Sequence, residues 1–258
     1  MTSASGLLLR IARCENIKVC RAHAGAACHT IVALQPQIPE QFQVPEPWSG
    51  QIETAPILFL SSNPSISDLS DDGEDYPTWD WSDAQISDFF DNRFDGGRKS
   101  WIVDGIRART RRGDLPKQWV RYWASVRQRA SELLPDHAVR PGIDYCLSEV
   151  VHCKSEDEVG VESAFPECTN RYLGPMLEAA AAIVIVCLGT YAGRAVRALT
   201  GSPESNRFVG PISLCGRDRF ACFLPHPNAR GVSKGFVSWL ADDELERVRR
   251  ALRLRIVA

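Results

Sequence analysis

Short runs of apolar residues, separated by segments with helical spacing, constrain the fold of this chain most strongly. The runs span Ile57–Leu60, Ile183–Leu188 and Phe220–Leu224, and Cys146–Val151 is a fourth candidate. An uninterrupted apolar run of this length is typical of a strand that is buried on both faces. Helical patterns occur at Ala84–Phe94, Gln118–Leu134, Pro166–Ala180, Tyr191–Leu199 and Asp242–Leu252. Strands that alternate with helices predict an α/β fold, a three-layer α/β/α sandwich around a mostly parallel central sheet.

The length and composition favour one soluble domain. We predict a single domain over residues 1–258, in which residues 1–50 form a cysteine-bearing lead segment and a proline-rich loop. The 44% hydrophobic and 24% charged residues are ordinary for a globular protein. No apolar run is long enough to span a membrane, and the first ten residues lack the basic start of a signal peptide. We therefore expect a cytoplasmic monomer with no membrane partner.

The charge distribution leaves the question of a nucleic-acid partner open. The chain has 30 basic and 32 acidic residues, which gives a formal net charge of −2. Basic residues concentrate between Arg93 and Arg129, and they include Arg98 and Lys99. Such a stretch is either a solvated face or a surface that binds phosphate groups.

Two of the predicted strands lead into loops where a polar residue stands beside a proline. Ser62-Asn63-Pro64-Ser65 follows the first strand, and His226-Pro227-Asn228 follows the last. Open α/β sheets place their chemistry in loops at the carboxyl ends of parallel strands. Each loop also has a simpler interpretation, because Asn-Pro is a common turn and a single histidine is often only a surface residue.

These segments resemble the active-site motifs of the uracil-DNA glycosylase superfamily. In that family the first motif carries an Asp, Glu or Asn that positions the attacking water, and Asn63 matches it. Ser62, Pro64 and Ser65 complete the motif, although glycines are usual at the serine positions. The final motif is His-Pro, whose histidine donates a hydrogen bond to the leaving base, and His226 matches it. The residues after that histidine enter the DNA minor groove; the matching positions here are Pro227, Asn228, Ala229 and Arg230.

Nine cysteines in a chain expected to be cytoplasmic argue against a disulfide framework. Five of them lie in polar or loop-like segments and are candidate ligands: Cys14, Cys20, Cys28, Cys153 and Cys168. The segments around Cys153 and Cys168 resemble the iron–sulfur branches of the superfamily. The resemblance implies a structural [4Fe–4S] cluster held by Cys14, Cys20, Cys153 and Cys168, with Cys28 as a substitute. Zinc, or no metal, remains an alternative.

Two further positions concern recognition of the base. The family places an aromatic residue about a dozen positions after the water-positioning residue, and Tyr76 matches it, with Trp79 and Trp81 as rivals. Glu149 stands where uracil-specific members carry an asparagine that reads the uracil edge. An ionised carboxylate only accepts hydrogen bonds, so it suits the amine of cytosine. A protonated one could donate to the carbonyl of uracil, which requires a strongly raised pKa.

The resemblance therefore implies a monofunctional DNA glycosylase. The expected substrate is a modified cytosine, such as glucosylated hydroxymethylcytosine in phage DNA, removed as antiviral defence. The alternative is a uracil-DNA glycosylase of base-excision repair. Two other classes compete: an inactive nucleic-acid-binding module of the same fold, and an unrelated α/β metabolic enzyme. The chain has no glycine-rich phosphate loop and no nucleophile elbow, which speaks against the last of these.

Overall fold

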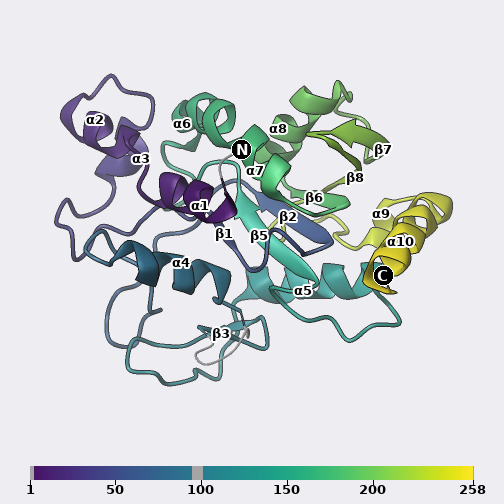
Figure 1. The fold of residues 1–258 in the computed structure, drawn as a ribbon, viewed down its shortest axis with the longest axis horizontal. Helices are drawn as coiled ribbons and strands as arrows, with labels where there is room; N and C mark the ends of the chain where they lie inside the picture. Colours follow the sequence, from purple (N-terminus) through teal and green to yellow (C-terminus); the bar gives the residue numbers. More distant parts are fainter. Residues whose placement is uncertain (1–2, 95–100, 258) are drawn as a thin grey trace.

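A six-stranded sheet forms the centre of the protein in the computed structural model, which describes residues 3–94 and 101–257 (Figure 1). The strand order is β1-β5-β2-β6-β8-β7. The strands are β1 (Trp48–Ser49), β2 (Ile57–Ser61), β5 (Tyr145–Glu149), β6 (Val184–Leu188), β7 (Phe208–Leu214) and β8 (Arg217–Leu224). The four inner strands run parallel, whereas β1 and β7 run antiparallel at the two edges. The predicted mixed α/β fold with a mostly parallel sheet is therefore confirmed.

Helices pack on both faces of this sheet. Alternate residues of β2 point to opposite sides: Leu58 and Leu60 join one hydrophobic core, and Ile57 and Phe59 join the other. The first core is covered by α1 (Ala4–Ala12), α2 (Asn16–Ala22), α3 (His29–Ala33), α4 (Asp83–Asp91), α6 (Val161–Cys168), α7 (Gly174–Ala179) and α8 (Thr190–Thr200). The second is covered by α5 (Arg121–Leu133), α9 (Phe236–Trp239) and α10 (Asp242–Val257). This arrangement is compatible with an α/β/α sandwich.

Several elements differ from the sequence-based expectation. The helix predicted over Pro166–Ala180 begins earlier, at Val161, and is divided by a π-helical segment at Thr169–Leu173. Proline lacks a backbone N–H, so Pro166 interrupts regular helical hydrogen bonding near this segment. The lead segment forms three helices, α1, α2 and α3, for which the sequence analysis predicted no secondary structure. A separate two-stranded sheet, β3 (Ile102–Val103) with β4 (Arg107–Ala108), lies outside the main sheet.

The register of the parallel strands determines where a site can form. Ser61 at the end of β2 pairs with Glu149 at the end of β5, and Leu188 pairs with Leu224 at the ends of β6 and β8. The loops that follow these strands therefore start from one edge of the sheet. None of the helices in the described part of the chain is long and apolar enough to cross a membrane.

Candidate active site

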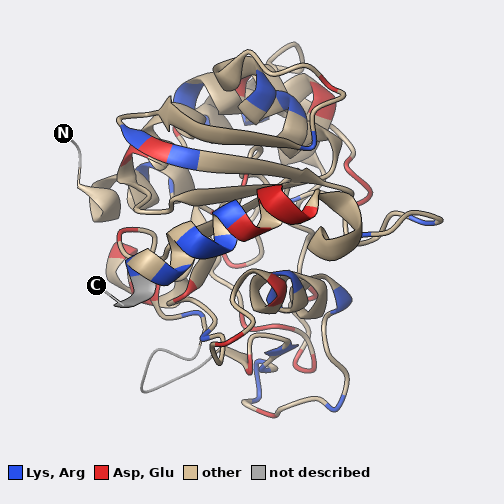
Figure 2. Cartoon of the chain, turned by 90° about the vertical axis from the view of Figure 1, so that its right-hand side faces the viewer, with Lys and Arg blue, Asp and Glu red and all other residues tan. Residues whose placement is uncertain are grey.

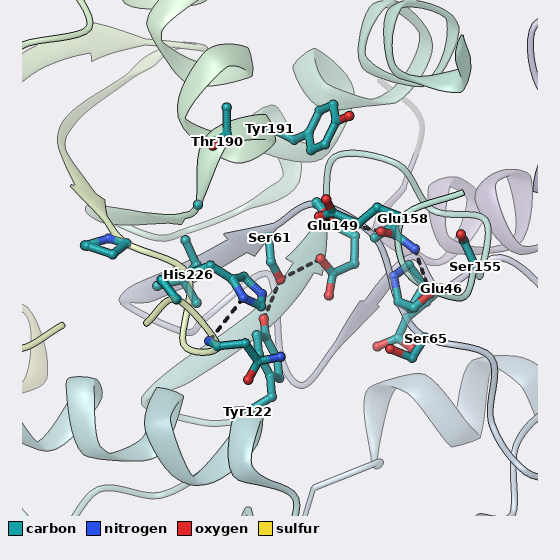
Figure 3. A pocket seen from close by; sticks show the side chains of 18 of the residues that line it. Glu46, Ser61, Ser65, Tyr122, Glu149, Ser155, Glu158, Thr190, Tyr191 and His226 are labelled. Carbon is teal, nitrogen blue, oxygen red and sulfur yellow. Dashed lines mark hydrogen bonds between the residues drawn. The ribbon is translucent and has the colours of Figure 1, made fainter. Parts of the chain in front are cut away.

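A cleft of about 1310 Å³ opens at the carboxyl edge of the parallel strands. It is lined by the carboxyl ends of these strands and the loops that follow them, which contribute Glu149 at the end of β5 and, from the loops, Asn63, Gly189 and His226. Figure 3 shows His226 and Tyr122 on one side of Ser61 and Glu149 on the other. The structure thus brings together the three principal site residues that the sequence analysis selected from distant segments.

The loop after β2 holds Asn63 through a set of short-range hydrogen bonds. The Asn63 amide donates from Nδ2 to the carbonyl oxygen of Pro64 at 3.0 Å, and Asn63 Oδ1 accepts from the Ser62 hydroxyl at 3.0 Å. The same hydroxyl lies 2.5 Å from Oε1 of Glu158, which belongs to the loop after β5. An amide nitrogen only donates, whereas an amide oxygen has two lone pairs, so Oδ1 is the atom of Asn63 that can accept a hydrogen bond from a water in the cleft. Pro64 and Ser65 also line the cleft.

His226 is held as a neutral hydrogen-bond donor. Its Nδ1 accepts from the backbone N–H of Asn228 at 3.2 Å, so the neutral ring carries its hydrogen on Nε2. Burial lowers the pKa of His226, and Lys234 acts in the same direction against the opposing effect of Glu158. A neutral imidazole N–H is suited to stabilise negative charge that develops on a bound group.

Two neighbours fix the position of the His226 ring. The Tyr122 ring from α5 stacks on it with centroids 6.0 Å apart and an angle of 23° between the ring planes. Gly189, whose φ is +87°, also approaches His226 so closely that a Cβ built there would lie 3.1 Å from the Cβ of His226. Only glycine provides both this conformation and this approach without strain.

Glu149 is buried at the floor of the cleft and hydrogen-bonded to a neighbouring strand. The Ser61 hydroxyl donates to Glu149 Oε2 at 2.6 Å, and the Tyr122 hydroxyl lies 2.5 Å from Ser61 Oγ. Burial raises the pKa of Glu149 to about 8, and the charge of Glu46 adds to this effect, whereas Ser61, Arg93 and Lys154 oppose it. A protonated carboxyl group, which can donate to a carbonyl, is therefore accessible alongside the ionised form, which can only accept.

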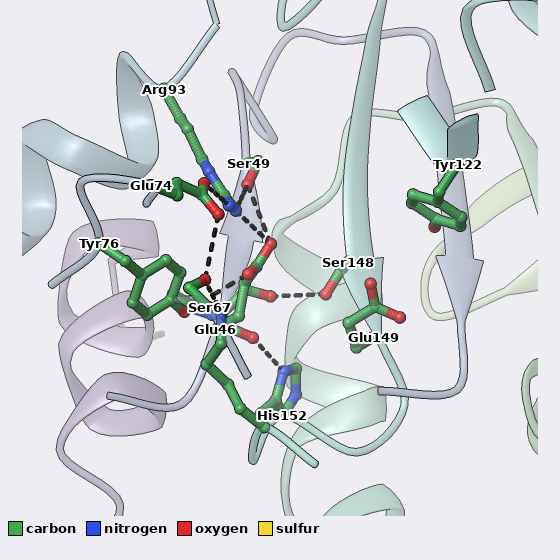
Figure 4. Close-up of polar contacts among 12 residues, drawn as sticks. Glu46, Ser49, Ser67, Glu74, Tyr76, Arg93, Tyr122, Ser148, Glu149 and His152 are labelled. Atoms are coloured by element: carbon green, nitrogen blue, oxygen red, sulfur yellow. Dashed lines mark hydrogen bonds and ion pairs between the residues drawn. The ribbon is translucent and has the colours of Figure 1, made fainter. Parts of the chain in front are cut away.

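Beyond Glu149 the cleft continues into a cluster of charged and polar side chains, which we call the charged subsite: Glu46, Ser67, Glu74, Arg93 and Lys154. Arg93 binds Oε1 of Glu46 and Oε1 of Glu74, each at 2.6 Å (Figure 4). Lys154 Nζ donates to the Ser67 hydroxyl at 3.0 Å. Glu46, Arg93 and Lys154 are at most 7% exposed. Buried charges of this kind are retained only when they are paired, so the subsite is rigid as well as polar.

The stacking role predicted for Tyr76 is wrong, because this side chain does not line the cleft. Tyr76 is 2% exposed, and its ring packs edge-on against Phe89 and Phe90 of α4. Its hydroxyl donates to the carbonyl oxygen of Val44 at 3.1 Å, and Lys154 Nζ lies 3.4 Å from the ring centroid. The rivals Trp79 and Trp81 also pack against the core. The aromatic residues that do line the cleft are Tyr122, Trp123, Tyr191, Phe223 and Trp239.

The loop after β8 lies partly in the cleft and partly outside it. Asn228 and Ala229 line the cleft together with His226, whereas Pro227 and Arg230 are not among its lining residues. Lys234 closes the loop by donating to the carbonyl oxygen of Pro227 at 2.6 Å. Arg230 is exposed, so the loop presents a basic side chain beside the cleft.

Part of the predicted basic stretch is neutralised locally. Arg93 is bound in the charged subsite, Arg112 pairs with Asp71, and Arg129 pairs with Glu132. Arg98 and Lys99 lie outside the described residues. Elsewhere on the molecule, α10 begins with the acidic residues Asp242, Asp243 and Glu244, and basic residues follow along the rest of the helix, as the colouring of the ribbon in Figure 2 shows.

Four of the candidate cysteines line a second, small cavity between the lead segment and the core: Cys14, Cys28, Cys153 and Cys168. Cys20, which we expected in this set, is buried beside Cys28 but does not line the cavity, so the substitute Cys28 takes its place there. Burial and the neighbouring thiols raise the pKa of Cys153. In residues 3–94 and 101–257 no group of three or more His, Cys, Asp or Glu side chains is arranged to hold a metal ion.

The donor chemistry of this cavity nevertheless fits a thiolate-bound centre. Sulfur atoms from three segments face one apolar-walled space, and the backbone N–H of His152 donates to Cys168 Sγ at 3.4 Å. Neighbouring thiolates repel one another. A bound cation stabilises them, because its positive charge offsets this repulsion.

No protein-family model matches this chain. A search of curated proteins finds no match either. The chemistry of the cleft is therefore inferred from its own groups. They are an amide oxygen that can hold a water, a neutral N–H donor, a buried carboxyl group and aromatic walls. Such a site can bind a flat heterocycle, read one polar edge of it and stabilise negative charge on another.

Proposed function

We propose that this chain is a monofunctional DNA glycosylase with a uracil-DNA glycosylase-like fold. It hydrolyses the N-glycosidic bond between deoxyribose and a base that is flipped out of DNA, and it leaves an abasic site. The observation that carries the proposal is the convergence of Asn63, Glu149 and His226 on one cleft at the carboxyl edge of four parallel strands.

The reaction requires little base strength from the protein. As the bond between C1′ and the base nitrogen breaks, its electron pair moves onto the base and the sugar becomes oxocarbenium-like. Asn63 Oδ1 orients a water toward C1′, and His226 Nε2–H donates to the base oxygen that gains negative charge. The water oxygen bonds to C1′, and its surplus proton neutralises the base anion through solvent.

Recognition of the base is assigned to Glu149 and the charged subsite. We propose a cytosine with a bulky hydroxyl-bearing group at position 5, for example glucosylated hydroxymethylcytosine in phage DNA, removed as antiviral defence. A pyrimidine read at position 4 by Glu149 directs its neighbouring position 5 along the cleft, where Glu74 and Lys154 have capacity for further hydrogen bonds. Sugar hydroxyls both donate and accept, so they suit a subsite of mixed charge. A strict requirement for the substituent would protect the unmodified cytosine of the host.

One observation favours a second candidate, the uracil-DNA glycosylase of base-excision repair. The pKa of Glu149 is raised to about 8 by burial, and a protonated carboxyl group can donate to the position-4 carbonyl of uracil. The charged subsite would then be empty beside an unsubstituted position 5.

We also propose a structural [4Fe–4S] cluster, with zinc as the alternative. Cys14, Cys28, Cys153 and Cys168 would hold it, and Cys20 lies next to Cys28. When bound, it would connect the lead segment to the loop after β5. The reaction does not pass through it.

The exposed loop Pro227–Arg230 is the proposed contact with the duplex. It continues directly from His226, so a wedge there would hold open the gap left by the flipped base. Arg230 supplies a positive charge for a nearby phosphate.

The test is base release from four duplexes that differ at one position: uracil, cytosine, hydroxymethylcytosine and its glucosylated form. Alkaline cleavage converts each abasic site into a strand break that can be counted. We expect breaks with glucosylated hydroxymethylcytosine and none with cytosine. Release of uracil alone would favour the repair function, and no release from any duplex would contradict the proposal.

A further inference from the structure

The two oxygens of Glu149 have different surroundings. Oε2 accepts from the Ser61 hydroxyl at 2.6 Å, whereas Oε1 has no hydrogen-bond partner among residues 3–94 and 101–257. Glu149 lines the cleft, so Oε1 is the oxygen that remains for a bound base. A carboxyl group with one oxygen already bonded reads its ligand through a single atom.

The hydroxyl of Ser61 makes this arrangement directional. A hydroxyl group has one hydrogen, and Ser61 Oγ lies between Glu149 Oε2 at 2.6 Å and the Tyr122 hydroxyl at 2.5 Å. An ionised carboxylate can only accept, so Ser61 donates to Oε2 and Tyr122 donates to Ser61. Burial and the charge of Glu149 raise the pKa of Tyr122, so Tyr122 keeps the proton that this chain of hydrogen bonds requires.

The groups around Glu149 act on its ionisation in opposite directions. Glu46 disfavours its ionised form, while Arg93 and Lys154 favour it, and burial disfavours it most. The resulting pKa of about 8 leaves both protonation states accessible under ordinary conditions.

We propose that Glu149 reads position 4 of the flipped base through Oε1 alone, and that Ser61 and Tyr122 are positioning residues that hold this atom ready either to accept or to donate. Ionised, Oε1 accepts from an amino group. Protonated at Oε1, it donates to a carbonyl group, while the chain from Tyr122 through Ser61 keeps its direction. The inference rests on the proposed function and deepens it, because it makes the preferred class of pyrimidine, amino-bearing or carbonyl-bearing, a function of pH.

The test compares two duplexes that differ only at position 4 of one base, 5-hydroxymethylcytosine and 5-hydroxymethyluracil. Both carry a 2′-fluoro-arabino sugar, which slows glycosidic cleavage so that binding is measured without reaction. The ratio of their dissociation constants is followed from about pH 6.5 to about pH 9.5. We expect the preference to move toward the amino-bearing base by about tenfold or more as the pH rises.

Three variants assign this change to the chain of hydrogen bonds. Glu149→Gln should give a ratio that does not change with pH. Ser61→Ala should move the midpoint to higher pH, because the ionised carboxylate loses its donor, and Tyr122→Phe should do so less. Ser131→Ala, on the exposed side of α5, is the matched control and should behave like the wild type.

Two results would overturn the inference: a wild-type ratio that stays constant across the pH range, or a midpoint that Ser61→Ala does not move.

Infrared spectroscopy gives a second measurement that needs no DNA. A protonated-carboxyl band should disappear as the pH rises through about 8 in the wild type and be missing from Glu149→Gln, and its presence in that variant would also refute the assignment. A pH-dependent ratio without base release from ordinary substrates would contradict the proposed function while supporting this reading of Glu149.

Discussion

Replacing Gly189 with alanine should displace the side chain of His226 and thereby lower the rate of base release. The new Cβ would lie 3.1 Å from the Cβ of His226, so the histidine or its loop must move by a few tenths of an ångström. The Gly189 backbone, with φ +87° and ψ −172°, lies in a region that essentially only glycine occupies, and this adds a cost of about 1–3 kcal/mol, which in a chain of this size lowers Tm by several degrees. Because Gly189 N–H donates to the carbonyl oxygen of Leu224 at 2.9 Å, the loop carrying His226 cannot shift freely.

The expected loss of activity is larger than the loss of stability. A donor that is misplaced relative to the developing charge costs roughly 10- to 100-fold in rate. Single-turnover base release and thermal unfolding should be measured on the same preparations. Gly201→Ala is the matched control, because Gly201 ends the same helix with φ +67° but has nothing within 4 Å of its built Cβ. It should lose stability and keep its rate; equal rates for wild type and Gly189→Ala would refute the reasoning.

Four other perturbations have defined outcomes. Asn63→Ala and His226→Ala should each lower base release by about a hundredfold or more while DNA affinity, measured by anisotropy, changes little. Arg93→Ala should destabilise the fold by about 3–5 kcal/mol in denaturant titrations, because the buried Glu46 and the half-buried Glu74 lose their partner. Burial raises the pKa of Glu149 in the folded protein to about 8, so the folded state holds this proton more tightly than the unfolded state does. The stability that this proton contributes is fully present below about pH 4.5 and is lost as the pH rises through about 8. Glu149→Gln should lack this loss when the free energy of unfolding is measured against pH. Protein prepared without air should be brown and bleach with dithionite, and a preparation with neither iron nor sulfide would end the cluster proposal.

The sequence predicted those parts of the molecule that depend on local pattern. The run Ile57–Leu60 is uninterrupted because both faces of β2 are buried, and this is visible without a structure. Asn63 and His226 could be paired in advance because parallel strands end at one edge of a sheet. Both inferences use rules of periodicity and topology that do not depend on side-chain packing.

The other features of the site depend on side-chain packing between distant segments, which the sequence pattern did not reveal. The spacing of Tyr76 from Asn63 could not indicate that the aromatic residues of α4 would bury the Tyr76 ring. The pair of Arg93 with Glu46 spans 47 residues and leaves no periodic signal. Tyr122 lies within the helix predicted over Gln118–Leu134, and only the structure shows that its side chain borders the cleft.

The central claim is that the cleft breaks an N-glycosidic bond, and the most direct measurement is the mass of what it releases. A duplex with one glucosylated hydroxymethylcytosine is incubated with wild-type protein and with His226→Ala, and the free products and the remaining strand are analysed by mass spectrometry. The account predicts an intact modified base together with an abasic strand, formed about a hundredfold more slowly by the variant. Release of glucose alone, deamination of a base that stays attached, or an unchanged strand would contradict it.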